Sequence, residues 1–256
     1  MIDIIIVLTY FTVVITAAFS GRIKNLTSEE YFLSSRNLKW YSIAISTIAT
    51  NVQGYQFLGM MGSAYLFGIA QASLEINAIQ GLFIAAFIFV PLFLKEKIIT
   101  ISQFIKIKLG KTLSNTYSIT YLLFFSTITI GAALFWGAYA TDAVFGNELS
   151  FLNENRVYRI GVLIIFLGVF SAVYTFFGGL SAVVRTDIIQ FSVLTFGGLA
   201  ILTICLIKIG GWSKLYELSP EKMHLFLESD HQYLPWTHVL GLFFLNINYW
   251  CANQTV

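Results

Sequence analysis

The segment Ala49–Met61, ATNVQGYQFLGMM, places three amides around a glycine in the middle of an apolar stretch. YSIAISTI precedes the segment and GSAYLFGIA follows it. A helix that crosses lipid is interrupted only where its freed backbone groups are buried in protein or line a cavity. Interrupted helices offer carbonyl oxygens to a cation and N–H groups to a polar solute, so the segment predicts a binding site. The alternative is that the amides bond neighbouring helices together, which explains one amide better than three around Gly54.

The composition of the chain indicates a membrane protein. Of 256 residues, 57% are hydrophobic and 11% are charged, whereas soluble domains carry roughly 25% charged residues. The net charge of +2 gives no reason to expect a nucleic-acid partner. Cys205 and Cys251 lie in apolar runs, and the three histidines form no i, i+4 pair, so neither a disulfide framework nor a metal site is predicted.

Six apolar runs are long enough to cross a hydrocarbon core, which takes about 20 helical residues. They lie at about 2–20, 40–67, 71–94, 116–143, 158–179 and 186–209, and a seventh begins near 235 and continues to 256. None alternates with the two-residue period of barrel strands, so the sequence predicts an all-α integral membrane protein. Basic residues follow the first run instead of preceding it, which favours a retained helix over a cleaved signal peptide.

The loops predict which side of the membrane each end faces. Lysine and arginine concentrate in loops 21–39 and 95–115 and in the short turn near Ser181, whereas loops 144–157 and 210–234 are poorer in them. The positive-inside rule therefore places the N-terminus outside the plasma (inner) membrane. Within loop 95–115, ISQFIKIKLGK predicts a short helix on the inner membrane surface, with its lysines near anionic lipid.

Two acids at membrane depth point to a functional site. Glu75 lies a few residues into the third run and Asp187 opens the sixth; an acidic side chain at mid-membrane costs roughly 2.5–3.5 kcal/mol on insertion scales. The alternatives are a headgroup-level acid at a helix end for Glu75 and a first-turn acid at the inner surface for Asp187. The last run holds four amides, Asn246, Asn248, Asn253 and Gln254, with Tyr249 and Trp250 among them, which predicts a second interrupted segment.

Several separated motifs resemble one family. YFLSSRNLKWYSIAISTIATN, YTFFGGLSAVVRTDIIQ, and YLPW followed by NYWCANQ are similar to motifs of the solute:sodium symporters, in particular the N-terminal half of bacterial sodium–galactose/glucose cotransporters. The resemblance implies an inverted-repeat transporter fold with broken helices in one transmembrane domain, 1–256, that is apparently truncated. It implies an extra helix at 2–20, a first five-helix repeat at 40–210 and the start of the second repeat at 235–256. Such a half-length chain is a gene fragment, a shortened version or a subunit of a split transporter.

The resemblance also assigns roles to residues. It implies these positions: Gln56, Glu75 and Asn246 for substrate binding, Met60, Tyr249 and Asn51 for the gates, and Ala49, Val52 and Asp187 for sodium. The sodium contacts of Ala49 and Val52 are made by backbone carbonyls, which need no particular side chain. Amides and a carboxylate suit the hydroxyl groups of a sugar. The sequence departs from the family at Leu74, where the bacterial sugar transporters have a tyrosine that touches the sugar.

The expected function is sodium-coupled symport of a sugar by alternating access. The expected partners are a small solute, sodium as the coupling ion and membrane lipid; no other cofactor is expected, and the oligomeric state is left open. One alternative is another small neutral solute, such as inositol or an amino acid, although the binding region has no base for an amino-acid carboxylate. A non-transporting sensor with the same fold is a further alternative. No nucleophile–base pair or metal cluster indicates an enzyme.

Overall fold

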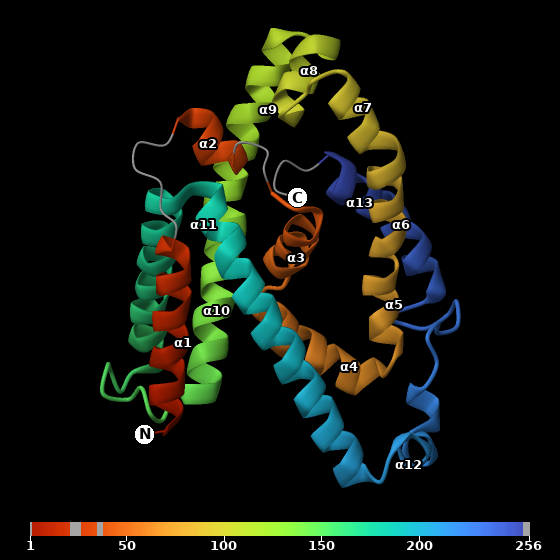
Figure 1. Ribbon diagram of the computed structural model, residues 1–256. Helices are drawn as coiled ribbons and strands as arrows, with labels where there is room; N and C mark the ends of the chain where they lie inside the picture. The colour runs from red at the N-terminus through yellow and green to blue at the C-terminus, as the bar shows by residue number, and fades with distance from the viewer. Residues whose placement is uncertain (1, 21–26, 35–37, 253–256) are drawn as a thin grey trace. The chain divides into compact units, whose positions relative to one another are not determined.

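The computed structural model describes residues 2–20, 27–34 and 38–252 (Figure 1). In these ranges the regular structure is helical, apart from an isolated bridge between Leu227 and Pro235. Four helical runs in the described part are long and apolar enough to cross a membrane: Ile2–Phe19, Ala70–Lys95, Lys111–Phe145 and Arg156–Ile209. The all-α prediction is confirmed, and the chain is an integral membrane protein.

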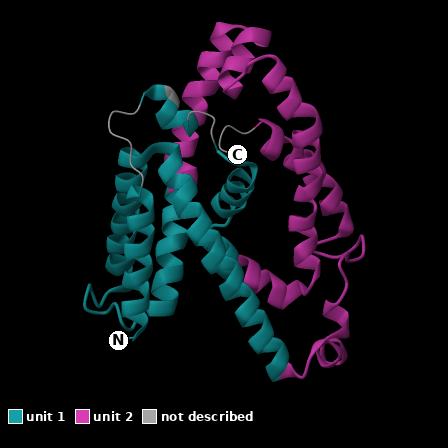
Figure 2. Ribbon diagram, in the orientation of Figure 1, with its two compact units in different colours: residues 1–58, 131–208 teal, residues 59–130, 209–256 magenta. Residues whose placement is uncertain are grey.

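The described residues form two compact units, which Figure 2 shows in different colours. Unit 1 comprises residues 1–58 and 131–208, and unit 2 comprises residues 59–130 and 209–256. The helices of unit 1 are α1 (Ile2–Phe19), α2 (Ser28–Leu33), α3 (Trp40–Asn51), nearly all of α10 (Ile130–Phe145) and nearly all of α11 (Arg156–Ile209). Those of unit 2 are α4 (Met61–Phe67), α5 (Ala70–Ile76), α6 (Ala78–Ile84), η3 (Ala85–Phe89), α7 (Val90–Lys95), α8 (Ile101–Leu109), α9 (Lys111–Phe124), η4 (Phe125–Thr129), α12 (Trp212–Leu218), η5 (Pro220–Lys222) and α13 (Trp236–Ala252). The proposed division into five-helix repeats stays a prediction.

The interruption predicted after Ala49 is confirmed. Helix α3 ends at Asn51, and Val52 has the extended backbone angles φ −90° and ψ 113°. The chain becomes helical again at Gly54 and then forms the π-helical turn η2 (Gln56–Met60), which leads into α4. A π-helical turn is rare and often marks a functional position in a helix.

Helix α11 contains two of the predicted spans joined by a sharp bend. Gly179 has φ 59° and ψ −162° within it, and Figure 1 shows two separate arms diverging from the bend. Only glycine adopts this conformation readily. A Cβ atom at Gly179 would also lie 2.8 Å from the carbonyl oxygen of Tyr31, which belongs to α2. The Tyr31 hydroxyl donates to the Thr175 carbonyl oxygen at 3.2 Å, and the hydroxyls of Ser34 and Ser181 are 2.5 Å apart.

The same bend is connected to the end of α1. The Arg185 guanidinium donates to the carbonyl oxygens of Ala17 and Ala18 at 3.2 and 3.0 Å. Carbonyls in the last turn of a helix have no partner within the helix, so Arg185 caps α1. The end of the first span and the turn near Ser181 therefore lie at the same end of unit 1, as the sidedness prediction requires.

The short helix predicted from ISQFIKIKLGK is confirmed as α8. The side chain of Thr100 caps its start by accepting from the Gln103 N–H at 3.1 Å. Gly110 ends it with φ 96°. The hydroxyl of Ser114, on α9, donates to the Ser102 carbonyl oxygen at 2.8 Å and joins the two helices. The location of α8 on the membrane surface stays a prediction.

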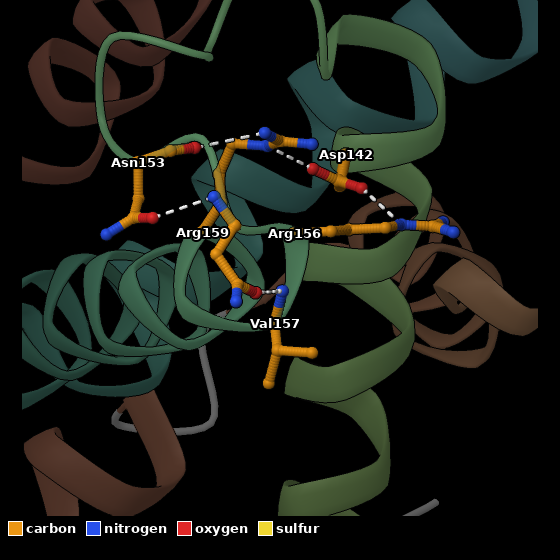
Figure 3. Close-up of polar contacts among 6 residues, drawn as sticks. Asp142, Asn153, Arg156, Val157 and Arg159 are labelled. Atoms are coloured by element: carbon orange, nitrogen blue, oxygen red, sulfur yellow. Dashed lines mark hydrogen bonds and ion pairs between the residues drawn. The ribbon is translucent and has the colours of Figure 1, made fainter.

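A cluster of charged side chains around Asp142 lies at the end of unit 1 opposite to the Gly179 bend (Figure 3). The Asp142 side chain on α10 is 2% exposed and accepts from Nε of Arg159 at 2.5 Å and from Nε of Arg156 at 2.8 Å. Arg159 also donates from Nη1 to the Asn153 carbonyl oxygen at 3.1 Å. The Arg156 guanidinium lies 4.7 Å from the centre of the Tyr139 ring. The cluster thus ties the loop between α10 and α11 to both helices.

Candidate functional site

The helix break redirects three backbone hydrogen bonds. The Gln53 N–H donates to Oε1 of the Gln56 side chain at 2.5 Å, instead of to the carbonyl of Ala49 as a regular helix requires. The Ala49 carbonyl accepts a shorter-range bond from the Val52 N–H at 3.2 Å. The Gln56 N–H donates to the Gln53 carbonyl at 3.1 Å, so the Val52 carbonyl loses its helical donor. Both predicted sodium-ligand carbonyls are therefore released from their α-helical bonds.

A groove beside the break is lined by two of the three residues predicted for sodium, Ala49 and Val52. It has a volume of about 510 Å³ and lies entirely within unit 1. Ala49 and Val52 line one side, and Gln190 and Leu194 from the second arm of α11 line another, with Tyr10 from α1. Gln190 and Tyr10 bring polar groups to a mainly apolar wall. The released carbonyls and the Gln190 amide belong to residues that line this groove, and oxygens of these kinds can bind a cation.

Asp187 is buried next to this groove. It is 4% exposed, and its carboxylate accepts a hydrogen bond from the Ser46 hydroxyl. Ser46 lies one helical turn before Ala49, and Asp187 lies nearly one turn before Gln190, so α3 and the second arm of α11 are neighbours here. Asp187 also lies two turns beyond the Gly179 bend. It is therefore not in the first turn after the bend, and its depth in the membrane stays a prediction.

Asn51 uses its side chain within its own helix. Its Nδ2 donates to the Thr47 carbonyl oxygen at 2.6 Å. Asn51 belongs to unit 1, whereas its predicted gate partner, Tyr249, belongs to unit 2. The pairing of Asn51 with Tyr249 stays a prediction.

Unit 2 holds the acid and the second amide predicted for the substrate. Glu75 lies near the end of α5 and is exposed, and Asn246 lies on α13 and is half-buried. Asn77 donates from Nδ2 to the Val239 carbonyl oxygen at 2.6 Å, which joins the α5–α6 junction to α13. One turn later, a Cβ atom at Gly81 would lie 2.7 Å from the Asn246 carbonyl oxygen. The helices that carry Glu75 and Asn246 therefore pack directly against one another.

The last span differs from the prediction in one respect. Helix α13 is continuous from Trp236 to Ala252, so no second interruption occurs within these residues. Asn246 and Asn248 are six and four residues from the C-terminal end of α13, and the one glycine of this helix, Gly241, is further back. Asn253 and Gln254 lie outside the described residues. Without a glycine beside the amides, the backbone keeps its helical bonds.

The predicted site residues therefore fall into two groups. Unit 1 contains the three sodium positions: Ala49 and Val52 at the break, where the Gln56 side chain also bonds, and Asp187, which bonds to Ser46 on the helix of Ala49. Unit 2 brings together the helices of Glu75, Asn246 and Tyr249, and it also contains Met60. The roles of these residues in binding and gating stay predictions.

Sequence reasoning missed four residues at these sites. Ser46 and Gln190 lie beside the sodium positions, and Asn77 and Gly81 lie between the helices of the substrate positions. The signal for Ser46 was its one-turn spacing from Ala49 within an apolar run. Asn77 carried a similar signal, because a buried amide in a membrane helix requires a partner.

Comparison with known proteins identifies the same family as the motifs. The model of the sodium:solute symporter family matches residues 31–232. The sodium/glucose cotransporter of Vibrio parahaemolyticus is 32% identical over 271 residues, which cover 100% of this chain and 48% of that protein. Sodium/glucose cotransporter 1 of Oryctolagus cuniculus is 26% identical, with 99% of this chain and 41% of that protein covered. Sodium/myo-inositol cotransporter 2 of Mus musculus is 25% identical over 99% of this chain and 39% of that protein.

A solved structure shares the fold. A Na⁺-coupled sialic acid symporter in a substrate-bound outward-open state matches with a TM-score of 0.76 at 19% identity, covering 99% of this chain and 52% of that one. The chain thus spans about half the length of the relatives that it matches. These relatives are transporters, which confirms the expectation that the chain is not an enzyme and has a symporter fold with broken helices. The family match covers most of the chain, and the resemblance read from the motifs is confirmed: the chain belongs to the sodium:solute symporter family.

Proposed function

We propose that this chain forms the N-terminal transport core of a symporter that couples sodium entry to uptake of a neutral, hydroxyl-rich solute, a sugar first of all. The observation that carries the proposal is the release of the Ala49 and Val52 carbonyls at the break, within a groove beside the buried Asp187. Carbonyl and carboxylate oxygens are hard ligands suited to a hard cation such as sodium.

Sodium binding at this position would couple to the shape of the broken helix. The released carbonyls depend on the Gln53 N–H bonding to the Gln56 side chain. Gln56 is also the amide proposed to contact the solute. Solute binding to Gln56 would therefore change the same hydrogen bond that shapes the broken segment around the sodium ligands. A ligand shifts a conformational equilibrium only when it binds the two states differently, and this shared side chain provides such a difference.

The substrate class follows from the polar groups of the substrate positions. Gln56 and Asn246 offer amides and Glu75 offers a carboxylate, which together donate to and accept from vicinal hydroxyls. No lysine or arginine is among the proposed site residues, which disfavours a carboxylate-bearing solute. Leu74 replaces a tyrosine of the bacterial sugar transporters, and both glucose and myo-inositol cotransporters are among the relatives, so an inositol is the main alternative solute.

Sodium-dependent uptake tests the proposal directly. Cells expressing the gene product that contains this chain should accumulate radiolabelled glucose, galactose or myo-inositol in sodium medium, and they should not do so when choline replaces sodium. The variant Asp187→Asn should raise the sodium concentration needed for half-maximal uptake more than it changes the solute KM. If none of these solutes enters in a sodium-dependent way at normal surface expression, the proposal is wrong and a sensor of the same fold is favoured.

The location proposed for the protein is the plasma (inner) membrane with the N-terminus outside. The charge bias of the loops supports it. The contact of α2 with the Gly179 bend and the bond from Arg185 to the end of α1 support it, because they put α2, the end of α1 and the bend at one end of unit 1.

A further inference from the structure

Asn77 is a buried amide of which only one of the two polar atoms, Nδ2, has a hydrogen-bond partner among the described residues. It lies between α5 and α6 and is 2% exposed. Its Nδ2 donates at 2.6 Å to the Val239 carbonyl oxygen, in the first turn of α13. Its Oδ1 finds no hydrogen-bond partner among the described residues.

Stability alone does not explain this arrangement. A buried acceptor without a partner is unfavourable, and an apolar side chain of similar size would remove that cost. What the amide adds is direction, because its single bond points to one backbone oxygen on a neighbouring helix. A bond to backbone fixes how far one helix has slid along the other, which apolar packing does not do.

The close approach of α6 and α13 makes that position along the axis matter. A Cβ atom at Gly81 would lie 2.7 Å from both the Asn246 carbonyl oxygen and Cδ1 of Trp250. The Cys251 sulfur is 3.7 Å from the Gly81 carbonyl oxygen. Gly81 lets the backbones meet, but a glycine has no side chain to set the register.

We propose that Asn77 is a positioning residue of the transport site, which sets the register of α13 against α5–α6 and thereby the spacing between Glu75 and Asn246. Glu75 precedes Asn77 by two residues, and Asn246 contacts the helix face one turn beyond it. A slide of α13 along α5–α6 would change the distance between the two groups. The proposal rests on the proposed function in taking Glu75 and Asn246 as solute ligands.

The variant Asn77→Asp gives a test with a pH signature. The introduced carboxyl group can donate to the Val239 carbonyl only when it is protonated, and burial favours the protonated form. We expect the KM for the solute to be raised at least about fivefold near pH 8 and to return to within about twofold of wild type near pH 5.5, with a nearly unchanged maximal rate per surface protein. Glu75 on α5 and His238 on α13 are titratable groups near this contact, and α6 has none, so wild-type protein is measured at each pH.

A second measurement does not depend on transport. Cys251 is buried against Gly81, so its alkylation by N-ethylmaleimide reports whether α13 keeps its position. In a Cys205→Ser background, the alkylation rate of the Asn77→Asp protein is divided by the rate of the parent protein, which keeps Asn77. We expect this ratio to exceed one near pH 8 and to approach one near pH 5.5. Dividing by the parent rate removes the pH dependence of the thiol itself.

The control variant is Ser73→Ala. Ser73 is also buried on α5, but its hydroxyl bonds within its own helix, to the Ala70 carbonyl oxygen at 2.7 Å. It should leave both measurements at wild-type values. An alkylation ratio of one at both pH values, or a KM of Asn77→Asp that does not change with pH, would overturn the role of Asn77. Absence of sodium-dependent uptake by the wild type would instead overturn the proposed function, and the alkylation ratio would still decide the role of Asn77.

Discussion

Glu75 is the residue on which solute affinity should depend most. It is exposed at the end of α5, so it contributes little to packing. We expect Glu75→Gln to raise the KM for the solute at least tenfold, which corresponds to about 1.4 kcal/mol, because the amide loses a charge-assisted bond to a hydroxyl. Uptake kinetics at matched surface expression measure this change. A wild-type KM in the variant would show that Glu75 is not a solute ligand.

Asp142 should contribute to stability rather than to transport affinity. Its carboxylate is buried between Arg156 and Arg159. Removing its charge leaves a buried arginine without a counter-charge, so Asp142→Asn should lower the free energy of unfolding by about 3–5 kcal/mol. Thermal unfolding in detergent, read by tryptophan fluorescence, checks this expectation. Glu217→Gln is the matched control, because Glu217 pairs with Lys214 at an exposed site and should change stability little.

Residue-level reasoning from sequence succeeded where chemistry is local. The amides around Gly54 predicted the broken segment, which lies beside a groove, and Asp187 proved to be buried, while its role stays a prediction. It did not find Ser46 or Asn77, whose partners are 141 and 162 positions away along the chain. Such partners depend on which helices become neighbours, and a single sequence does not state this.

At the scale of helices, the break depends on a glycine that packs against another backbone. A Cβ atom at Gly54 would lie 2.7 Å from the carbonyl carbon of Trp136 on α10. We expect Gly54→Val to reduce stability by about 1–3 kcal/mol and to abolish uptake, because the segment after the break can no longer lie against α10. Gly59→Ala is the control, since nothing lies within 4 Å of a Cβ atom there. Wild-type uptake by Gly54→Val would show that the close contact is not needed.

Helix existence was predictable from the sequence, but helix interruption was only partly so. The apolar runs predicted every long helix, because length and hydropathy decide whether a segment spans lipid. The amides of Asn51, Gln53 and Gln56, with Gly54 among them, correctly predicted the break after Asn51. The same signal in α13 did not break the helix, because Asn246 and Asn248 have no adjacent glycine.

At the scale of the whole molecule, the topology can be tested without any transport assay. Lys97 and Lys108 should face the cytoplasm and Asn153 should face outside, according to the charge bias of the loops. Single cysteines placed at these positions in a Cys205→Ser background should react with a membrane-impermeant maleimide in intact cells only at position 153. Labelling at 97 and 108 but not at 153 would reverse the orientation.

The bond between Arg185 and the end of α1 has a consequence for synthesis. It joins residues 168 positions apart, and the first part of unit 2 is made between them. At 5–20 residues per second the ribosome takes about 10–30 s to cover that distance. The first span therefore waits in the bilayer, without the Arg185 cap on its last carbonyls, while four further predicted spans are synthesised. Unit 1 is completed only after the first part of unit 2 has been made, which gives membrane chaperones time to recognise the unfinished protein.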